Sequence, residues 1–292
     1  MKNLSQLIAN GTIILDGGWG TQLQQRGLEI GAHPDLWNLT APEKVEDVAK
    51  AYVNAGSQIL LTNTFGSTKF PLKKHGCENK VAEINRAGVE ISKRAAEGTA
   101  VKVFASIGPT GVMLVMGTVK PEELYDAFLE QAEAQAAGGA DGIVVETMSD
   151  PAEAALAVKA AKTTGLPVAV SFVFDSGKAK DRTMMGTTPE QMVSQMTDAG
   201  ADVVGSNCGQ GIDGFIPICR RIRASTTLPI WMKANAGLPE IVDGQTVYRQ
   251  SPDIFAEKAV ELVEAGANFV GGCCGTSPDF IRALQQKLTI HR

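Results

Sequence analysis

Short β-branched or apolar runs alternate with longer amphipathic stretches along most of the chain. Apolar runs of this kind are typical of buried strands, whereas apolar positions three and four residues apart are typical of helices. The alternation predicts eight strands that are separated by helices. We place the strands at residues 12–18, 58–65, 101–109, 142–148, 167–174, 202–208, 229–237 and 269–275.

The helical stretches carry their own start and stop signals. Most begin with proline at or near the first helical position, where no backbone N–H is needed. Several run into glycine, for example Gly56, Gly200 and Gly266, and glycine tolerates the left-handed conformation that ends a helix. The clearest helices are predicted at residues 121–137, 151–163, 189–199 and 252–265.

Strands that alternate with helices pair in parallel through right-handed crossovers. Eight such units predict an α/β protein with a (β/α)8 TIM barrel, a fold that usually needs roughly 250 residues. The chain has 292 residues, 44% of them hydrophobic, and no linker-like run, so we expect a single domain over residues 1–292. A doubly wound parallel sheet shows the same alternation and is the alternative fold.

The charge pattern argues against some classes of partner. The formal net charge is −5, and the small basic clusters at residues 178–182 and 220–223 contain no interleaved aromatic residues, so nucleic-acid binding is not expected. No apolar stretch reaches the ~18 residues of a membrane helix, and residues 1–11 lack the apolar core of a signal peptide. These features predict a cytoplasmic protein without a membrane partner.

Cysteines stand at two of the predicted strand ends. Cys208 ends the sixth strand, and Cys273 and Cys274 lie near the end of the eighth, flanked by glycines. The carboxyl ends of barrel strands form the active-site face, so these three thiols can converge there. Three thiolates and an open fourth position are the ligand set expected of a catalytic Zn²⁺. We therefore predict that these cysteines bind zinc and carry the catalysis.

A free cysteine on its own is more often a small buried hydrophobic residue, and we assign this role to Cys77 and Cys219. A disulfide between adjacent cysteines is poorly accommodated, because their Cα atoms lie about 3.8 Å apart and ordinary bridges span ~4.4–6.8 Å. The chain has three histidines, His33, His75 and His291, and none stands at a predicted strand end. A histidine-rich metal site is therefore not expected.

Polar residues also end other strands. Glu146 follows four apolar residues, where a carboxylate is costly unless it meets a cation, either a substrate amino group or a basic residue of the barrel. Asp16, Gly17 and Gly18 close the first strand, and the glycines expose backbone N–H groups that suit a carboxylate. Thr64, at the end of the second strand, either positions a polar substrate or satisfies the loop backbone.

Together these motifs resemble the homocysteine S-methyltransferase family. The resemblance covers essentially the whole chain and rests on Asp16-Gly17-Gly18-x-Gly20-Thr21, Asn63-Thr64-Phe65, Glu146-Thr147, Asn207-Cys208 and Gly271-Gly272-Cys273-Cys274-Gly275. It implies a zinc barrel in which the three cysteines hold the metal and the homocysteine sulfur is the fourth ligand. It also implies that Asp16, Gly17 and Gly18 form a substrate loop, that Glu146 binds the substrate amino group and that Asn207 neighbours the metal.

The implied chemistry agrees with the residue types. A free thiol is mostly protonated at neutral pH, and Zn²⁺ makes its thiolate available. A fourth thiolate on a site that already has three carries excess negative charge, which keeps electron density on the sulfur for attack on a methyl carbon. We therefore predict a zinc-dependent transfer of a methyl group to homocysteine or a similar small thiol, with methionine as the product from homocysteine.

The resemblance allows three methyl donors: betaine, S-methylmethionine and methylcobalamin. Residues 63–68 are more similar to the cobalamin-dependent members, whereas a betaine enzyme would want an aromatic cage and only 5% of the residues are aromatic. The chain ends soon after the eighth helix, so we expect methylcobalamin carried by a separate corrinoid protein, with S-methylmethionine next. The long segments 19–38 and 65–80, with Trp19, Trp37, Phe65 and Phe70, are predicted to form the docking surface.

Two other functions compete with this prediction. One is a corrinoid-linked methyltransferase or demethylase that uses another thiol or transfers the methyl group in the reverse direction. The other is a non-enzymatic zinc-binding barrel that serves only as an interaction module. Zinc together with tightly bound homocysteine would favour the homocysteine methyltransferase. Zinc without affinity for thiols would favour the interaction module.

Overall fold

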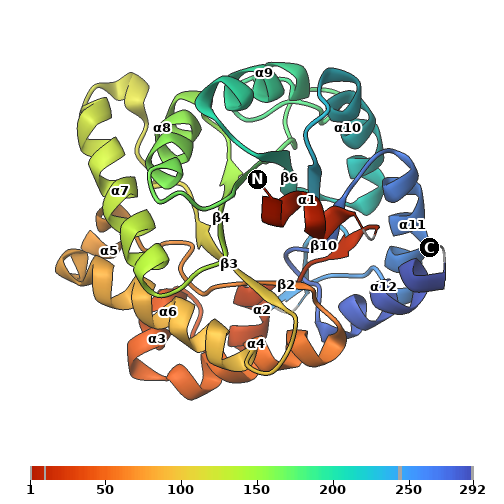
Figure 1. Ribbon diagram of the computed structural model, residues 1–292, viewed down its shortest axis with the longest axis horizontal. Helices are drawn as coiled ribbons and strands as arrows, with labels where there is room; N and C mark the ends of the chain where they lie inside the picture. The colour runs from red at the N-terminus through yellow and green to blue at the C-terminus, as the bar shows by residue number, and fades with distance from the viewer. Residues whose placement is uncertain (1, 10, 243–244, 291–292) are drawn as a thin grey trace.

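The computed structural model describes residues 2–9, 11–242 and 245–290, which form a barrel of eight parallel strands surrounded by helices (Figure 1). The strand order is β1-β10-β7-β6-β5-β4-β3-β2, so strands that are consecutive in the barrel series lie side by side. This order excludes the doubly wound sheet and confirms the TIM barrel. The strands are β1 (Ile13–Ile14), β2 (Ile59–Leu61), β3 (Lys102–Ile107), β4 (Gly142–Met148), β5 (Val168–Phe172), β6 (Val203–Gly211), β7 (Ile230–Asn235) and β10 (Phe269–Gly272).

Helices form the outer layer of the barrel. The longer ones are α4 (Pro42–Ala55), α6 (Val81–Ala95), α7 (Pro121–Ala137), α8 (Pro151–Lys162), α9 (Pro189–Ala199), α10 (Ile212–Ser225), α11 (Pro252–Glu264) and α12 (Pro278–Ile290). The bounds of α7 and α9 match the prediction, and α8 and α11 end one residue earlier than predicted. Gly56 and Gly200 end their helices with φ of 103° and 94°, in the left-handed region that the sequence indicated.

Short helices lie in the loops and at one end of the barrel. They are α1 (Lys2–Ile8), α2 (Trp19–Gln25), α3 (Trp37–Thr40), α5 (Lys69–Lys73), η1 (Pro34–Leu36), η2 (Glu78–Lys80) and η3 (Leu114–Met116). α1 lies across the barrel opening that faces the viewer in Figure 1, and the sequence pattern did not predict it. None of the helices in the described ranges has the length and hydropathy needed to cross a bilayer.

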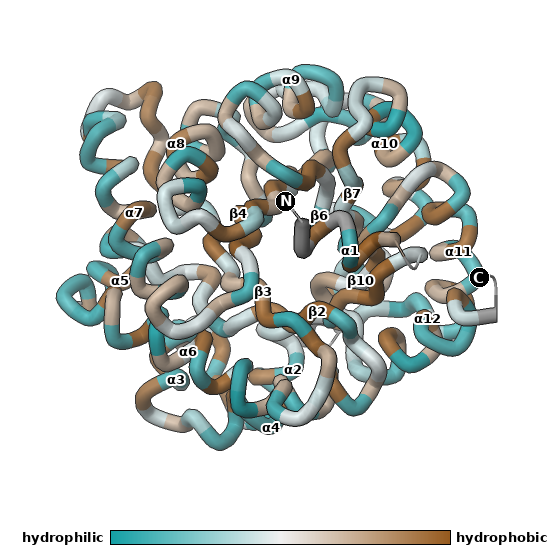
Figure 2. Tube along the Cα trace, in the orientation of Figure 1, coloured by the Kyte–Doolittle hydropathy of each residue, from teal (hydrophilic) through white to brown (hydrophobic). Residues whose placement is uncertain are grey.

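Large apolar side chains fill the interior of the barrel. Phe104 stacks on Trp231 with a centroid separation of 6.0 Å, and Trp231 lies 5.5 Å from Phe269. Leu4 of α1 joins the same buried cluster, so this helix covers the inner core. Figure 2 shows hydrophobic segments gathered along the strands and hydrophilic ones on the outer helices. Burial of this apolar surface is the main term that stabilises the barrel.

A backbone hydrogen bond and side chains, rather than a continuous strand ladder, bridge β1 and β2. The Gln58 backbone N–H donates to the Ile14 carbonyl at 2.7 Å, and Gln58 Oε1 accepts from the Ile14 N–H at 2.9 Å. Further along, the Leu61 N–H donates to Asp16 Oδ2 at 2.8 Å. Asp16 therefore satisfies backbone at the point where the barrel closes.

Two strands become irregular at their carboxyl ends. The register of β4 with β5 shifts around Thr147, and the register of β6 with β7 shifts around Cys208, so β6 continues beyond its predicted end. Thr147 and Cys208 have φ of 64° and 62°, a conformation that costs a residue other than glycine roughly 1–3 kcal/mol. Bulges near active sites re-aim side chains. Here they redirect the strand ends that carry Glu146 and Cys208.

A two-stranded hairpin, β8 (Glu240–Val242) and β9 (Gln245–Val247), interrupts the connection between β7 and α11. The sequence pattern did not reveal it. Tyr248 follows β9 and places its ring against Gly275, where an added Cβ would lie 2.2 Å from the ring. The hairpin therefore packs beside the cysteine-bearing end of β10.

Candidate active site at the barrel mouth

A pocket of about 360 Å³ opens at the carboxyl ends of the barrel strands. Its walls come from the loops after β1 and β2 and from the ends of β4, β6, β7 and β10. The lining residues include the three cysteines, Glu146, Lys233 and Trp19. The pocket therefore combines candidate metal ligands with charges of both signs.

The three predicted cysteine ligands come together. The sulfur atoms of Cys208, Cys273 and Cys274 all lie within 4.8 Å of one another, and the Cys208 and Cys274 sulfurs are 3.8 Å apart. All three residues are half-buried and none forms a disulfide. They are the one group of histidine, cysteine or acidic residues in the described ranges that is placed to hold a metal.

The backbone bends so that adjacent cysteines can face one site. The Cys273 N–H donates to the Ala234 carbonyl at 2.7 Å, and the Cys274 carbonyl accepts from the Ala236 N–H at 3.0 Å. These bonds hold the end of β10 against β7 while the chain turns. Gly275 takes up the turn with φ of 80°. The prediction that flanking glycine permits the bend agrees with this geometry.

Without a metal ion, the clustered thiols disfavour their charged forms. The pKa of Cys208 is about 11, because its contact with Cys273 lowers it less than the contact with Cys274 and burial raise it. The pKa of Cys274 is about 12: contact with Cys208 lowers it, but Cys273 and burial raise it more. Contact with Cys208 and burial also raise the pKa of Cys273. A cation is the group that would stabilise three thiolates at this spacing.

Cys77, Cys219, His33 and His75 do not belong to this cluster. Cys219 is buried, with its sulfur 3.8 Å from the Leu262 carbonyl, as its assignment to the core predicted, whereas Cys77 is only partly buried. His33 lines the pocket, but its Nε2 lies 3.0 Å from the Gly66 carbonyl, and its ring is tilted against that of His75 with a centroid separation of 4.9 Å. His291 lies outside the described residues.

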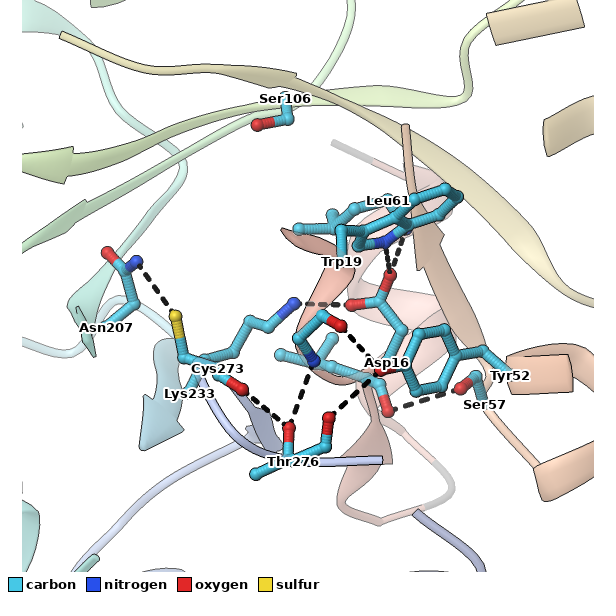
Figure 3. A network of polar contacts seen from close by, with 12 residues as sticks. Asp16, Trp19, Tyr52, Ser57, Leu61, Ser106, Asn207, Lys233, Cys273 and Thr276 are labelled. Carbon is cyan, nitrogen blue, oxygen red and sulfur yellow. Dashed lines mark hydrogen bonds and ion pairs between the residues drawn. The ribbon is translucent and has the colours of Figure 1, made fainter. Parts of the chain in front are cut away.

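Asp16 and Lys233 form a buried ion pair beneath the pocket (Figure 3). Asp16 Oδ1 accepts from Lys233, and Asp16 Oδ2 accepts from Trp19 Nε1 at 2.8 Å as well as from the Leu61 N–H. Asp16 is fully buried and does not line the pocket, whereas Lys233 is 2% exposed and does. Although burial lowers the pKa of Lys233, the charges of Asp16, Glu146 and Cys273 raise it more, so the ammonium form is favoured.

Glu146 lies in the pocket wall beside Lys233. Its Oε1 accepts a hydrogen bond from Ser106 Oγ at 2.5 Å, and its side chain is buried apart from a small exposed part. Burial raises the pKa of Glu146, and the positive charge of Lys233 opposes that rise. A basic residue of the barrel therefore does act on this carboxylate, one of the two possibilities that the sequence left open.

Asn207 lies behind the thiols and organises the ends of β4 and β6. Its Nδ2 lies 3.9 Å from the Cys273 sulfur and 2.7 Å from Thr147 Oγ1 (Figure 3 shows the first contact). Its Oδ1 accepts from the Thr147 N–H and from Ser171 Oγ, each at 2.7 Å. Asn207 is fully buried, so it neighbours the pocket without lining it.

The glycine loop and Thr64 are placed differently from each other. Gly17 and Gly18 line the pocket, but the Gly18 N–H already donates to Thr276 Oγ1 at 3.0 Å. An added Cβ at Gly18 would lie 2.6 Å from the Cys273 carbonyl, so this glycine lets the loop pack against the cysteines. Thr64 is buried and donates to the Ser106 carbonyl at 2.8 Å, outside the pocket wall.

Two charged residues of the pocket wall, Lys233 and Asp35, were not singled out as site residues from the sequence. Lys233 follows three apolar residues in β7, the same signal that singled out Glu146, and could have been found in that way. Asp35 gave no such signal, because it lies in a loop. Its buried Oδ2 accepts from the Gly66 N–H and Ser67 Oγ, both at 2.7 Å, and so ties the loop after β1 to the loop after β2.

Comparison with known proteins places this barrel and site in a family. Residues 13–288 match the family model of the homocysteine S-methyltransferases, so the chain belongs to this family of methyltransferases. It is similar to the methionine synthases of Mycobacterium leprae and Mycobacterium tuberculosis, with identities of 30% and 29% over 300 residues, or 97% of this chain. The chain spans about a quarter of the length of these relatives, 25% in each case.

Solved structures agree with the fold. The homocysteine methyltransferase MmuM from Escherichia coli superposes in its metallated form with a TM-score of 0.78 and 22% identity, over 94% of this chain and 96% of that chain. Its apo form gives a TM-score of 0.73 and 21% identity, over 94% of this chain and 95% of that chain. This likeness extends over the whole barrel.

Proposed function

We propose that this protein is a zinc-dependent S-methyltransferase that methylates the thiol of homocysteine to give methionine. The observation that carries the proposal is the convergence of three thiols on a pocket whose wall also holds Glu146 and Lys233. Membership of the homocysteine S-methyltransferase family supports the same reaction.

The donor set fits a zinc ion. Three cysteine sulfurs, no disulfide and an adjoining pocket make up a three-ligand site with room for a substrate ligand. Cys208, Cys273 and Cys274 would hold the ion. When bound, zinc supplies a low-pKa thiolate at neutral pH.

The side chains around the thiols bind the substrate or position the pocket wall. Glu146 receives the α-ammonium group of the substrate, because it lines the pocket and its pKa stays raised despite Lys233, so that a further positive charge would stabilise its carboxylate. Gly17 and Gly18 form the floor beside the cysteines. Asp16, Thr64 and Asn207 contribute from behind the pocket wall, where they hold Lys233, the end of β3 and the bulges of β4 and β6.

For the methyl donor we propose a methylated corrinoid protein, with S-methylmethionine as the second choice. The mouth loops support a large donor, because they expose Phe65, Val115, Met116, Met184 and Ile241 to solvent. Exposed apolar residues that gather on one face are typical of a docking surface. Of the four aromatic residues predicted as contacts, Phe65 is exposed, whereas Trp19, Trp37 and Phe70 pack against the core.

The test measures methionine formation from homocysteine by the zinc-loaded protein. The donors are a methylated corrinoid protein, free methylcobalamin, S-methylmethionine and betaine, each added alone. We expect methionine with the corrinoid protein, and none when Cys274→Ser replaces the wild type. If S-methylmethionine is the one donor that supports turnover, the proposed corrinoid donor is wrong, whereas homocysteine stays the proposed acceptor. Methylation of the corrinoid by a methylated substrate, with no methionine from any donor, would favour the reverse reaction.

A further inference from the structure

We propose that Lys233 determines substrate specificity by binding the α-carboxylate of the substrate, opposite Glu146. The two side chains then recognise the two charges of an amino acid, and the pocket selects amino-acid thiols over simple thiols. This inference rests on the proposed methylation of homocysteine and adds the part of the site that holds the amino-acid end of the substrate.

Lys233 has unused hydrogen-bonding capacity. An ammonium group carries three N–H donors. Across the described ranges, Asp16 is the one hydrogen-bond partner of this ammonium group, although the Lys233 side chain is only 2% exposed. A buried charge that keeps free donors is costly unless an acceptor reaches it. Because Lys233 lines the pocket, a ligand in the pocket can supply that acceptor.

Asp16 anchors Lys233 but does not itself contact a ligand in the pocket. Its two carboxylate oxygens are occupied by Lys233, Trp19 Nε1 and the Leu61 N–H. It is fully buried and lies outside the pocket lining. Asp16 therefore fixes the position of the ammonium group from behind and leaves its pocket side free.

A carboxylate in the pocket has fewer backbone partners than the sequence suggested. Of the glycine-loop N–H groups proposed for this role, that of Gly18 already donates to Thr276 Oγ1 at 3.0 Å and to the Thr276 carbonyl at 3.3 Å. Lys233 is the one lysine or arginine among the residues that line the pocket. It is therefore the strongest donor that an anionic group would meet there.

The pocket wall carries two opposite charges. Glu146 and Lys233 both line it, and the charge of each acts on the other. An α-amino acid carries its ammonium and carboxylate groups on one carbon atom, so two neighbouring protein charges of opposite sign complement it. A thiol that lacks either group gives up its contact with one of these two protein charges.

The experiment compares three thiols of equal reach by calorimetry on the zinc-loaded protein. They are homocysteine, 3-aminopropane-1-thiol, which lacks the carboxylate, and 4-sulfanylbutanoate, which lacks the amino group. Lys233→Met should weaken homocysteine and 4-sulfanylbutanoate by about tenfold or more and leave the aminothiol unchanged. Glu146→Gln should weaken homocysteine and the aminothiol and leave 4-sulfanylbutanoate unchanged.

Two further variants control for the loss of an ion pair as such. Lys233→Met leaves Asp16 buried without its cation, so Lys233→Met/Asp16→Asn removes both charges and keeps an acceptor for Trp19 and Leu61. The double variant should show the same ligand pattern as Lys233→Met. Lys162→Met breaks the Lys162–Asp202 ion pair of 2.7 Å, which has no part in the pocket, and should leave all three affinities unchanged.

The outcomes separate this inference from the function beneath it. If the wild type binds all three thiols and Lys233→Met weakens them equally, the carboxylate role is overturned while the methyltransferase proposal stands. If homocysteine binds the wild type no better than the two truncated thiols, the recognition of both charges is also overturned. If none of the three thiols binds the zinc-loaded wild type, the proposed function itself fails, and the inference fails with it.

Discussion

Asn207 and Thr147 exchange two hydrogen bonds across the barrel mouth. Asn207 Oδ1 accepts from the Thr147 N–H, and Asn207 Nδ2 donates to Thr147 Oγ1, both at 2.7 Å. Thr147 has φ of 64°, which is rare for a β-branched residue. The pair therefore holds a strained turn in place and couples the strand end of Glu146 to the strand end of Cys208.

Loss of this pair should destabilise the protein. Asn207→Ala leaves the Thr147 N–H and Ser171 Oγ without their acceptor in a buried region, and we expect a loss of roughly 2–4 kcal/mol in the free energy of unfolding. Urea denaturation measures it. Thr147→Gly is the matched control: it loses one hydroxyl but relieves the strained φ, so its effect should stay within about 1 kcal/mol. Equal effects of the two variants would contradict the coupling.

Zinc content should follow the three clustered cysteines alone. Protein purified without added metal is expected to contain about one zinc per chain, and Cys208→Ser, Cys273→Ser and Cys274→Ser should each lose most of it, since these three clustered sulfurs are the protein ligands that we propose for the ion. Elemental analysis measures the content. Cys219→Ser and Cys77→Ser should keep the metal, because neither belongs to the cluster. A full complement of zinc in the triple serine variant would rule out the site.

Gly275 should be far less tolerant of substitution than another glycine of the same backbone conformation. Gly275 and Gly98 have φ of 80° and 75°, but an added Cβ meets the Tyr248 ring at 2.2 Å only at Gly275 and meets nothing within 4 Å at Gly98. Gly98→Ala should cost about 1–2 kcal/mol for its backbone. Gly275→Ala should cost more and also lower the zinc content. Equal losses of stability, with zinc retained in both, would show that the contact with Tyr248 is unimportant.

Glu153 should make the folded protein less stable as the pH rises above about 4.5. Burial raises its pKa from the usual 4.5, although two bonds from Thr110 to its Oε1, at 2.8 and 2.6 Å, oppose the rise. The folded state therefore holds this proton more tightly than the unfolded state, and stability falls as the pH climbs from 4.5 through the raised pKa. Glu153→Gln keeps the acceptor without the charge. It should be more stable than the wild type at pH 7 and equal to it below 4.5, by urea denaturation.

Glu190 provides a control of opposite sign. A hydrogen bond from Arg221 lowers its pKa to about 2, so its contribution is present above pH 4.5 and disappears as the pH falls through about 2. Glu190→Gln should therefore be less stable than the wild type at pH 7 and should approach it in acid. A pH dependence of the same sign for Glu153→Gln and Glu190→Gln would contradict the role of burial at Glu153.

The sequence by itself determined the order of the barrel strands and outer helices and the grouping of the three cysteines. Local patterns suffice for both: β4, α7 and α9 have their predicted bounds, and helix-ending glycines signal themselves through the backbone freedom that they need. The three cysteines stood at strand ends, and the carboxyl ends of barrel strands meet on one face whatever the details of packing. The grouping of their sulfurs followed from topology.

The tertiary structure alone decided which side chains face the pocket. Asp16 and Lys233 are 217 positions apart, and their pairing depends on how β1 and β7 lie in the closed barrel. The bulges at Thr147 and Cys208 depend on registers between neighbouring strands. α1 and the β8–β9 hairpin are too short for a clear periodicity and are stabilised by contacts distant in sequence. A local pattern carries no information about such contacts, because their free energy arises only when distant segments pack together.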